Sequence, residues 1–368
     1  MNPTLKKIQL LSKLPAFHAF RILGKPSLFP VNITISLLYA CNSRCMTCNI
    51  YLKKVKRFTP EEYEKLFRNL GKAPYWFTFS GGEPFLRKDI AEIVKLAYRY
   101  CEPGIINIPT NGSLPQLVGT QVEDILKNCP RSEVIINLSL DQLGEKHDRI
   151  RGLKDNFKKA METYRILKEL KRYPNLTIGI HTVISNFNVD EFREIYDGLI
   201  QLEPDSYITE IAEQRVELGT MGEPITPDLE RYSRAIDYLR SRMRERKMNG
   251  VAQIAQAFRY EYYQLVKQIL SQQTQVIPCF AGIMSAQISP DGEVWPCCIR
   301  ADSMGNLRDH DYDFKKVWTS GQAKKIRRSI RNKECHCPLA NASYTNMLAS
   351  PRTLIKVARH LVNGLQED

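Results

Sequence analysis

Three cysteines within eight residues are the group in this 368-residue chain whose type and spacing point most directly to chemistry. Cys41, Cys45 and Cys48 have the spacing C-x3-C-x2-C and follow a short apolar, β-prone run at 31–39. A cubane iron–sulfur cluster takes one thiolate on each of its four irons. One tight loop with three cysteines would therefore leave one iron open for a non-protein ligand. Two alternatives stay open on spacing alone, namely buried thiols on one helix face and part of a zinc site.

A second motif follows the next expected strand. The run 75–80 is typical of a buried strand, and it leads into Gly81-Gly82-Glu83-Pro84 and an amphipathic helix expected around 90–100. With the two motifs in this order, the chain resembles the radical S-adenosylmethionine (radical SAM) superfamily. The resemblance implies that Cys41, Cys45 and Cys48 ligate a [4Fe–4S] cluster whose open iron binds the amino and carboxylate groups of S-adenosylmethionine (AdoMet).

The same resemblance implies the reaction. Reductive cleavage of AdoMet would give a 5′-deoxyadenosyl radical that abstracts hydrogen from a substrate C–H bond, while the protein positions the groups and excludes water. Backbone carbonyls of Gly81 and Gly82 and the Glu83 carboxylate would receive the AdoMet ammonium group. Thr47 departs from the family pattern, in which the residue before the last cysteine is usually aromatic and packs near the adenine.

Two later strand ends supply further candidates for cofactor binding. The resemblance places five of their residues around AdoMet: Thr110, Asn111, Ser139, Asp141 and Arg151. Ser139 and Asp141 would lie near the ribose and carboxylate, and Arg151 would pair with the carboxylate. Ordinary turn chemistry is the alternative for each, because Asn-Gly and Ser or Asp are common at strand ends.

The alternation of strand-like and helix-like segments predicts an α/β fold. Strands are expected near 31–38, 75–80, 105–109, 134–140, 176–184 and 206–211, and helices at 60–70, 121–128, 156–172 and 189–202. This repeated βα unit predicts a partial (β/α)6 TIM-like barrel with its chemistry at the C-terminal strand ends. His181, Glu210 and Glu213 are candidate catalytic groups at that mouth, with structural or solvated roles as the alternative.

A second cysteine group lies toward the C-terminus. Pro290-Asp291-Gly292 predicts a hairpin turn that would bring Cys279 and Cys297 together on adjacent strands. The spacing from Gly292 to Cys297 resembles the SPASM/twitch extension, and the few downstream cysteines imply a twitch-like β-hairpin/helix domain with one auxiliary [4Fe–4S] cluster. Its expected ligands are Cys279, Cys297, Cys335 and Cys337, with Cys298 as a substitute for Cys297. A zinc site of four thiolates, or of three with His336, is the alternative.

These observations divide the chain into five expected segments. They are a basic amphipathic N-terminal segment (1–30), the radical SAM barrel (31–222), a helical bridge (223–275), the auxiliary-cluster domain (276–345) and a basic C-terminal helix (346–368).

Charge and cysteine use bear on compartment and partners. The net charge is +13, and the first 60 residues contain no Asp or Glu. Basic amphipathic stretches at 5–23, 314–331 and 354–362 could dock on anionic lipid headgroups, bind RNA phosphates or be solvated helix faces. No nucleic-acid motif favours RNA. Clustered cysteines, and the lack of a recognisable signal peptide or spanning segment, predict a cytoplasmic protein, with peripheral binding at the inner membrane face as an extension.

Four functions remain in view. The basic ends favour a radical SAM enzyme acting on a lipid or lipid-linked substrate at the membrane surface. The alternative is a peptide- or protein-modifying maturase of the SPASM/twitch type, and a tRNA-modifying enzyme and a non-catalytic iron–sulfur protein are the remaining options. Each enzymatic option requires a reducing electron donor of the flavodoxin or ferredoxin type.

Overall fold

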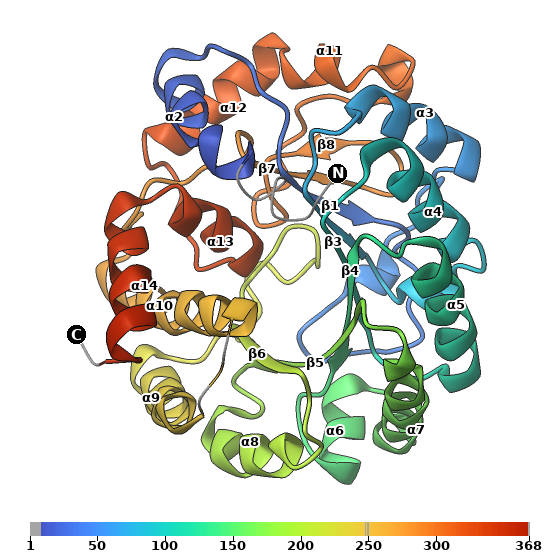
Figure 1. Cartoon of the computed structure of the whole chain (residues 1–368), viewed down its shortest axis with the longest axis vertical. Helices are drawn as coiled ribbons and strands as arrows, with labels where there is room; N and C mark the ends of the chain where they lie inside the picture. The colour runs from blue at the N-terminus through green and yellow to red at the C-terminus, as the bar shows by residue number, and fades with distance from the viewer. Residues whose placement is uncertain (1–8, 247, 249, 367–368) are drawn as a thin grey trace.

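The computed structural model describes residues 9–246, 248 and 250–366. Its centre is an eight-stranded sheet with the order β6-β5-β4-β3-β2-β1-β7-β8 (Figure 1). The strands are β1 (Asn32–Ser36), β2 (Trp76–Ser80), β3 (Ile105–Thr110), β4 (Glu133–Ser139), β5 (Leu176–Ile184), β6 (Ser206–Ile211), β7 (Ser285–Ile288) and β8 (Val294–Trp295). Every neighbouring pair of these strands is parallel except β7 and β8.

Helices connect the first six strands and cover their outer face. They are α3 (Pro60–Leu70), α4 (Ile90–Cys101), α5 (Pro115–Asn128), α6 (Gly144–Arg151), α7 (Asn156–Glu169) and α8 (Phe192–Ile200). Short 3-10 turns lie at η1 (Ile50–Leu52), η2 (Pro84–Leu86), η3 (Leu170–Arg172), η4 (Val189–Glu191) and η5 (Arg308–His310). The predicted partial TIM-like barrel is confirmed.

The barrel strands are apolar outside and polar inside, because successive side chains of a strand point to opposite faces. Ile33, Phe77 and Ile106 are fully buried in the main hydrophobic core, which also contains Leu66 of α3 and Ile93 of α4. The intervening positions line the interior and are mostly polar, as in Thr34, Thr78, Asn107 and Asn137. Closed TIM barrels instead fill this interior with branched apolar side chains.

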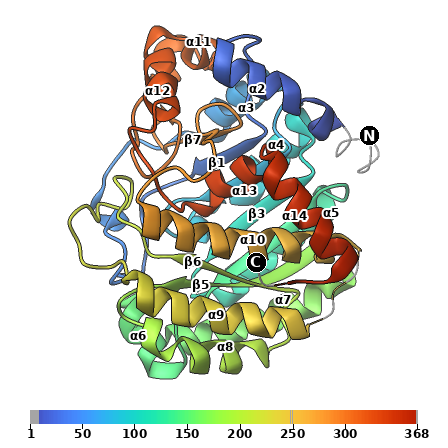
Figure 2. The same cartoon turned by 90° about the vertical axis from the view of Figure 1, so that its left-hand side faces the viewer.

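A layer of C-terminal helices covers the side of the barrel that the strands leave open (Figures 1 and 2). It contains α9 (Leu229–Glu245), α10 (Gly250–Gln272), α13 (Ala340–Leu348) and α14 (Pro351–Asn363), and α10 packs against the other three. On α13, the Asn341 side chain donates to Thr34 Oγ1 of β1 (3.1 Å), and Tyr344 lines the barrel interior. The α13 helix is therefore a wall of the internal space.

The predicted hairpin turn forms at 290–292, where the Gly292 N–H donates to the Ser289 carbonyl (3.1 Å). Strand β7 of this hairpin pairs with β1, with Asn32 opposite Ser285, so hairpin and barrel share one sheet. The boundaries expected for the five segments stay a prediction.

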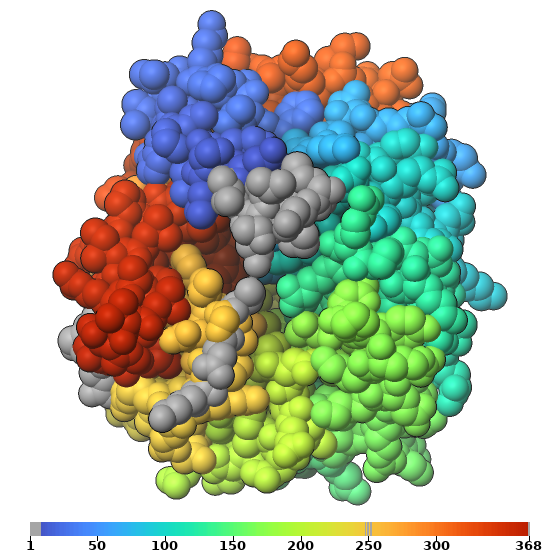
Figure 3. Space-filling view, viewed as in Figure 1, coloured from blue at the N-terminus to red at the C-terminus, as the bar shows by residue number. Residues whose placement is uncertain are grey.

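Segments near the two ends of the chain pack together. The helices here are α2 (Leu14–Leu23), α11 (Phe314–Trp318) and α12 (Gly321–Arg331). His18 of α2 bonds the Ala349 carbonyl (2.8 Å), and Figure 3 shows the blue N-terminal segment beside the red C-terminal segment. The first eight residues of the expected N-terminal segment lie outside the described part. Among the described helices, none combines the length and apolar character needed to cross a membrane.

Candidate functional site

The three clustered cysteines lie on the loop after β1 and line a cavity of about 290 Å³ inside the barrel. The loop is not helical, so the alternative of buried thiols on one helix face is excluded. Two backbone bonds fix it to the end of α6, from Arg44 N–H to the Arg151 carbonyl and from Met46 N–H to the Ile150 carbonyl, both 2.9 Å.

Burial and the nearby Arg151 act in opposite directions on the thiols of this loop. Burial raises the pKa of all three thiols, that of Cys48 to about 12, while the nearby Arg151 guanidinium acts to lower them. Iron binds thiolates, so binding must release these protons. Among the described residues, no three His, Cys, Asp or Glu side chains group closely enough to hold a single metal ion. A cubane cluster instead takes one thiolate on each of several irons.

The Gly81-Gly82 turn packs directly on the strand exit that leads to Cys41. A Cβ atom would lie 2.2 Å from the Leu38 carbonyl oxygen at Gly81 and 2.1 Å from that of Ala40 at Gly82. Both positions thus require glycine because of the protein's own backbone. Whether the turn also receives the AdoMet ammonium group stays a prediction.

The Glu83 carboxylate is 2% exposed and holds the end of β3. It accepts hydrogen bonds from the Thr110 hydroxyl (2.8 Å), the Asn111 N–H (2.8 Å) and the Phe85 N–H (3.2 Å). Burial raises its pKa, and these bonds act in the opposite direction. A carboxylate has about four acceptor sites, so one remains for an ammonium group.

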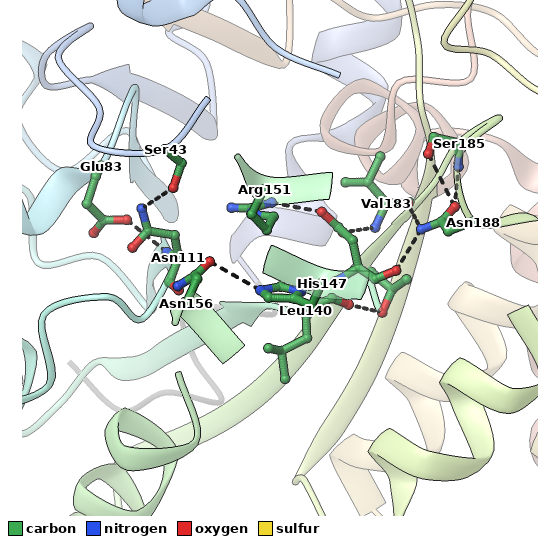
Figure 4. Close-up of polar contacts among 12 residues, drawn as sticks. Ser43, Glu83, Asn111, Leu140, His147, Arg151, Asn156, Val183, Ser185 and Asn188 are labelled. Atoms are coloured by element: carbon green, nitrogen blue, oxygen red, sulfur yellow. Dashed lines mark hydrogen bonds and ion pairs between the residues drawn. The ribbon is translucent and has the colours of Figure 1, made fainter. Parts of the chain in front are cut away.

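A chain of polar contacts joins the cysteine loop to the ends of β3, β4 and β5 (Figure 4). Asn111 donates to Ser43 Oγ (2.9 Å), and its carbonyl accepts from Asn156. Asn156 contacts His147 (3.2 Å), which accepts from the Asp141 N–H. Burial lowers the pKa of His147 to about 4, so this imidazole is neutral near pH 7. Sequence reasoning did not single out His147 or Asn156 as positioning residues.

Arg151, at the end of α6, has an unused donor beside the cysteine loop. Its Nη1 donates to Asp141 (2.9 Å), whose other oxygen accepts from the Val183 N–H. The Arg151 Nε atom is buried, has no partner and borders the same cavity as the three cysteines. This orphaned donor fits the carboxylate of an AdoMet bound at the cluster. Ser139 also lines the cavity.

The deeper cavity is lined by amides that sequence reasoning missed. Asn137 donates to Asn107 (2.7 Å), and its Oδ1 has no partner although the residue is only 7% exposed. The Trp76 Nε1 and the Tyr344 hydroxyl, which also line this space, are likewise buried without partners. The signal was present in the sequence, because both asparagines occupy inward positions of strands that are otherwise apolar.

His181, Glu210 and Glu213 all border the cavity, as expected for the strand mouth. A residue not predicted, Arg215, joins the two carboxylates, at 3.0 Å from Glu210 and 3.4 Å from Glu213. Burial acts to raise the pKa of Glu210, but His181 and Arg215 hold this pKa below its ordinary value. Burial raises the pKa of Glu213 to about 7, against the effect of Arg215.

The second cysteine group lies in the C-terminal part of the chain, around the β7–β8 hairpin and the segment after α12. Cys279 lies before β7 and Cys297 after β8, so the prediction that both sit on adjacent strands was wrong: the hairpin strands end short of them. Burial raises the pKa of the Cys297 thiol to about 12, and the nearby thiols of Cys279 and Cys335 raise it further. Arg300 donates to Cys335 Sγ (3.7 Å). Burial raises the pKa of the Cys337 thiol, and Cys297 and Cys279 likewise raise it, so Cys337 belongs with these cysteines.

Cys298 has different electrostatic partners. After burial, Arg215 and Glu217 of the loop after β6 have the largest effects on the pKa of its thiol, and among the expected ligands only Cys297 affects it. The structure therefore groups Cys297, rather than Cys298, with the other expected ligands.

Comparisons with known proteins identify both parts. The radical SAM superfamily model matches residues 35–199, and the model for SPASM, an iron–sulfur cluster-binding domain, matches residues 279–338. Fe-coproporphyrin III synthase of Methanosarcina barkeri is 26% identical over 76% of this chain and 71% of that protein. Two Bacillus subtilis proteins are also similar. The sporulation killing factor maturation protein SkfB is 26% identical over 46% of this chain and 40% of its own length. The antilisterial bacteriocin subtilosin biosynthesis protein AlbA is 25% identical over 84% of this chain and 66% of its own length.

The solved structure of Streptococcus suis SuiB bound to precursor peptide SuiA aligns with a TM-score of 0.58 at 16% identity, over 81% of this chain and 67% of that one. It shows the shared fold. The SPASM match favours iron–sulfur over zinc at the second cysteine group, and the cofactors are a [4Fe–4S] cluster, AdoMet and auxiliary iron–sulfur. The chain belongs to the radical SAM superfamily and is a radical SAM enzyme with a C-terminal SPASM domain.

Proposed function

We propose that this enzyme modifies a peptide or protein by abstracting hydrogen from a C–H bond within the barrel. The observation that carries the proposal is a set of polar groups without protein partners in the cavity next to the cysteine loop. Asn107, Asn137 and Trp76 present hydrogen-bonding groups there, and two of their atoms, Asn137 Oδ1 and Trp76 Nε1, have no protein partner.

The free-energy cost of leaving buried polar groups unpaired favours a peptide over an acyl chain in this cavity. A hydrocarbon substrate would leave the unpaired groups without water or a partner, at a cost of about 1–3 kcal/mol for each. Peptide groups and polar side chains supply both donors and acceptors. Asn137 Oδ1 can accept from a substrate N–H, and Trp76 Nε1 can donate to a substrate carbonyl. The cavity thus favours a substrate rich in amides.

The names of two relatives also support a peptide substrate. SkfB and AlbA are named for the maturation and biosynthesis of a killing factor and a bacteriocin, and the M. barkeri relative is named for a porphyrin. Nothing in the described residues or the comparisons supports the lipid substrate and membrane surface expected from the basic ends. The alternative of a peptide maturase therefore becomes the main proposal.

Residue roles follow from the geometry. Cys41, Cys45 and Cys48 would hold the AdoMet-binding cluster, which would supply the electron for reductive cleavage of bound AdoMet. Arg151 would hold the AdoMet carboxylate through its unpaired Nε. Glu213, with a pKa raised to about 7 by burial, is suited to take or return a proton at the cavity wall.

Mass spectrometry can test the proposal while the substrate itself is still unidentified. An extract of source cells lacking the gene is separated into peptide and lipid fractions, and each is incubated anaerobically with reconstituted enzyme, AdoMet and dithionite. We expect an AdoMet-dependent mass change in a peptide, absent with a C41A/C45A/C48A variant. A mass change confined to the lipid fraction would contradict the proposal.

A further inference from the structure

The outer side of the cysteine loop carries a group of exposed apolar side chains. Met46 lies between two of the cluster cysteines and is 48% exposed, while Leu52 and Val55 are 67% and 39% exposed. Val216 and Met221, on the loop after β6, are 40% and 60% exposed. A patch of this kind on a soluble surface commonly marks an interaction site.

The two segments that carry this patch are joined. The Asn49 N–H donates to the Leu218 carbonyl, and Lys53 Nζ donates to the Val216 carbonyl, both at 2.8 Å. Figure 2 shows the blue segment after β1 and the yellow segment after β6 on the same side of the molecule. The two segments that carry the exposed apolar side chains therefore lie side by side.

Cations border the patch on the chain that follows the cysteines. Lys54, Lys56 and Arg57 are exposed, and Arg44 lies within the cysteine loop itself. The nearby carboxylate of Glu62 is already paired with Arg308 (2.7 Å). An apolar centre with a cationic border suits a partner whose surface is acidic.

This basic segment is held in place from beneath. Arg308 donates to the carbonyls of Lys56 (2.8 Å) and Arg57 (3.2 Å). The Phe58 N–H donates to the Pro290 carbonyl (2.7 Å), and the Phe58 ring is buried. The backbone is therefore fixed while the cationic side chains project into solvent, and such a preorganised surface loses little entropy on binding.

We propose that this surface, formed by Met46, Leu52, Val55, Lys54, Lys56 and Arg57 and called here the donor face, docks an acidic one-electron donor protein of the flavodoxin or ferredoxin kind. The face covers the outer side of the loop whose inner side lines the cavity, so a docked donor reaches the cluster position without entering the substrate space. The donor would lose one electron and so be oxidised, the cluster held by Cys41, Cys45 and Cys48 would gain it and be reduced, and no atom or proton would be exchanged at the face.

The size and charge of the face agree with such a partner. Electron-transfer encounters use small interfaces, below about 1,200 Å², and depend on electrostatic steering that raises association rates by about 10- to 1,000-fold. Steering weakens as salt shortens the screening length. The proposal does not depend on what the substrate is.

Reductant choice gives the sharpest test. The reconstituted holoenzyme is assayed for 5′-deoxyadenosine with reduced flavodoxin, a small acidic donor, and separately with dithionite, which needs no docking. The variant Lys54→Glu with Lys56→Glu is compared with Lys324→Glu and Lys325→Glu, an equal charge change at exposed positions of α12. Binding of oxidised flavodoxin is measured in parallel by calorimetry.

We expect the donor-face variant to lower the flavodoxin-driven rate at low salt by about tenfold or more and to weaken flavodoxin binding to a similar degree. Its dithionite-driven rate should stay within about twofold of wild type, and the difference should shrink as salt is added. Leu52→Gln should slow the flavodoxin-driven rate by a smaller factor, through the apolar centre.

Three results would overturn the donor face. The first is equal slowing with both reductants, which would indicate damage to the cluster loop. The second is an equal effect of the α12 variant, which would indicate a general charge effect. The third is unchanged flavodoxin kinetics together with a higher KM for a modified peptide under dithionite, which would make the face a substrate surface.

Discussion

The two cysteine groups of this enzyme are built differently, although both gather thiols that are at least partly buried. The first, Cys41, Cys45 and Cys48, opens on the barrel cavity, whereas none of the four auxiliary cysteines is among the described residues that line this space. Between them runs the loop after β6, whose Val216 and Glu217 N–H groups donate to the carbonyls of Ile299 (3.1 Å) and Cys298 (3.3 Å). The first group is therefore open to a ligand in the cavity, whereas the described part of the chain separates the second group from that cavity.

The arginines near each group show the same contrast. Arg151, near the first group, keeps a buried Nε without a partner. Arg300, at the second, is shared among Cys335 Sγ, Ser329 and Asp302. The first site is thus prepared for a ligand from outside the chain, while the second, with four candidate thiolates, is self-contained.

Removing the first cysteine group should separate the two sites most completely. In the variant with Ala at Cys41, Cys45 and Cys48 we expect no 5′-deoxyadenosine, because no other thiols line the cavity beside Arg151 in the described part of the chain, while auxiliary iron remains bound. Iron analysis and product assays on the anaerobically purified protein measure both. Residual AdoMet cleavage would refute the assignment.

Arg151→Met should weaken AdoMet binding by about 10- to 100-fold, since a hydrogen bond to a charged group contributes about 1.5–3 kcal/mol. The Asp141 carboxylate would also lose its partner, so Arg151→Lys is included to retain the charge without the guanidinium geometry. Arg300→Met is the control, and it should change the spectrum of the auxiliary cluster only. Equal AdoMet affinity in wild type and Arg151→Met would remove Arg151 from the cofactor site.

Asn137→Leu tests the polar cavity. We expect peptide modification to fall by about tenfold, because the substrate loses an acceptor and meets an apolar surface, while AdoMet cleavage uncoupled from modification continues. Asn128→Leu, at an exposed position of α5, makes the same chemical change outside the cavity. Faster turnover of a lipid by Asn137→Leu would be the opposite of this expectation.

Glu213→Gln should have the smallest effect, on the pH dependence of stability. Burial raises the pKa of Glu213 in the folded protein to about 7, above its ordinary value of 4.5. Its contribution to stability is therefore complete below pH 4.5 and is lost as the pH rises through 7. Between about pH 5.5 and 8.5 the Tm of the wild-type holoenzyme should fall a few degrees more than that of Glu213→Gln. Glu223→Gln, an exposed carboxyl on the same loop, should follow the wild type.

Much of the fold was predictable because the barrel repeats one simple pattern. The limits of β5, β6 and α3 agree with the sequence prediction, since apolar periodicity and clear caps mark them. Thr59, for example, caps α3 with Glu62 in a capping box. Helix α5 instead begins at Pro115, six residues before its predicted start, because Pro115 takes the first helical turn, where proline is tolerated.

The site was predictable only where the motif is local. The cysteine spacing and the Gly-Gly-Glu turn can be read from consecutive residues. Arg215 could not be found this way, because its partners Glu210 and Glu213 are recognised as a buried group only after β6 is placed. Asn341 and Tyr344 reach the cavity from a helix beyond the barrel, by a contact that no periodicity encodes.

Hydrogen transfer from the substrate to AdoMet can be followed with deuterium, and it distinguishes a peptide substrate from a lipid. Peptide and lipid fractions are prepared from cells lacking the gene, grown on deuterated amino acids or on deuterated lipid precursors, and are incubated with the reconstituted enzyme and AdoMet. We expect deuterium in 5′-deoxyadenosine with the labelled peptide fraction, and none with the labelled lipid fraction. Deuterium that enters 5′-deoxyadenosine from the lipid fraction alone would contradict this expectation.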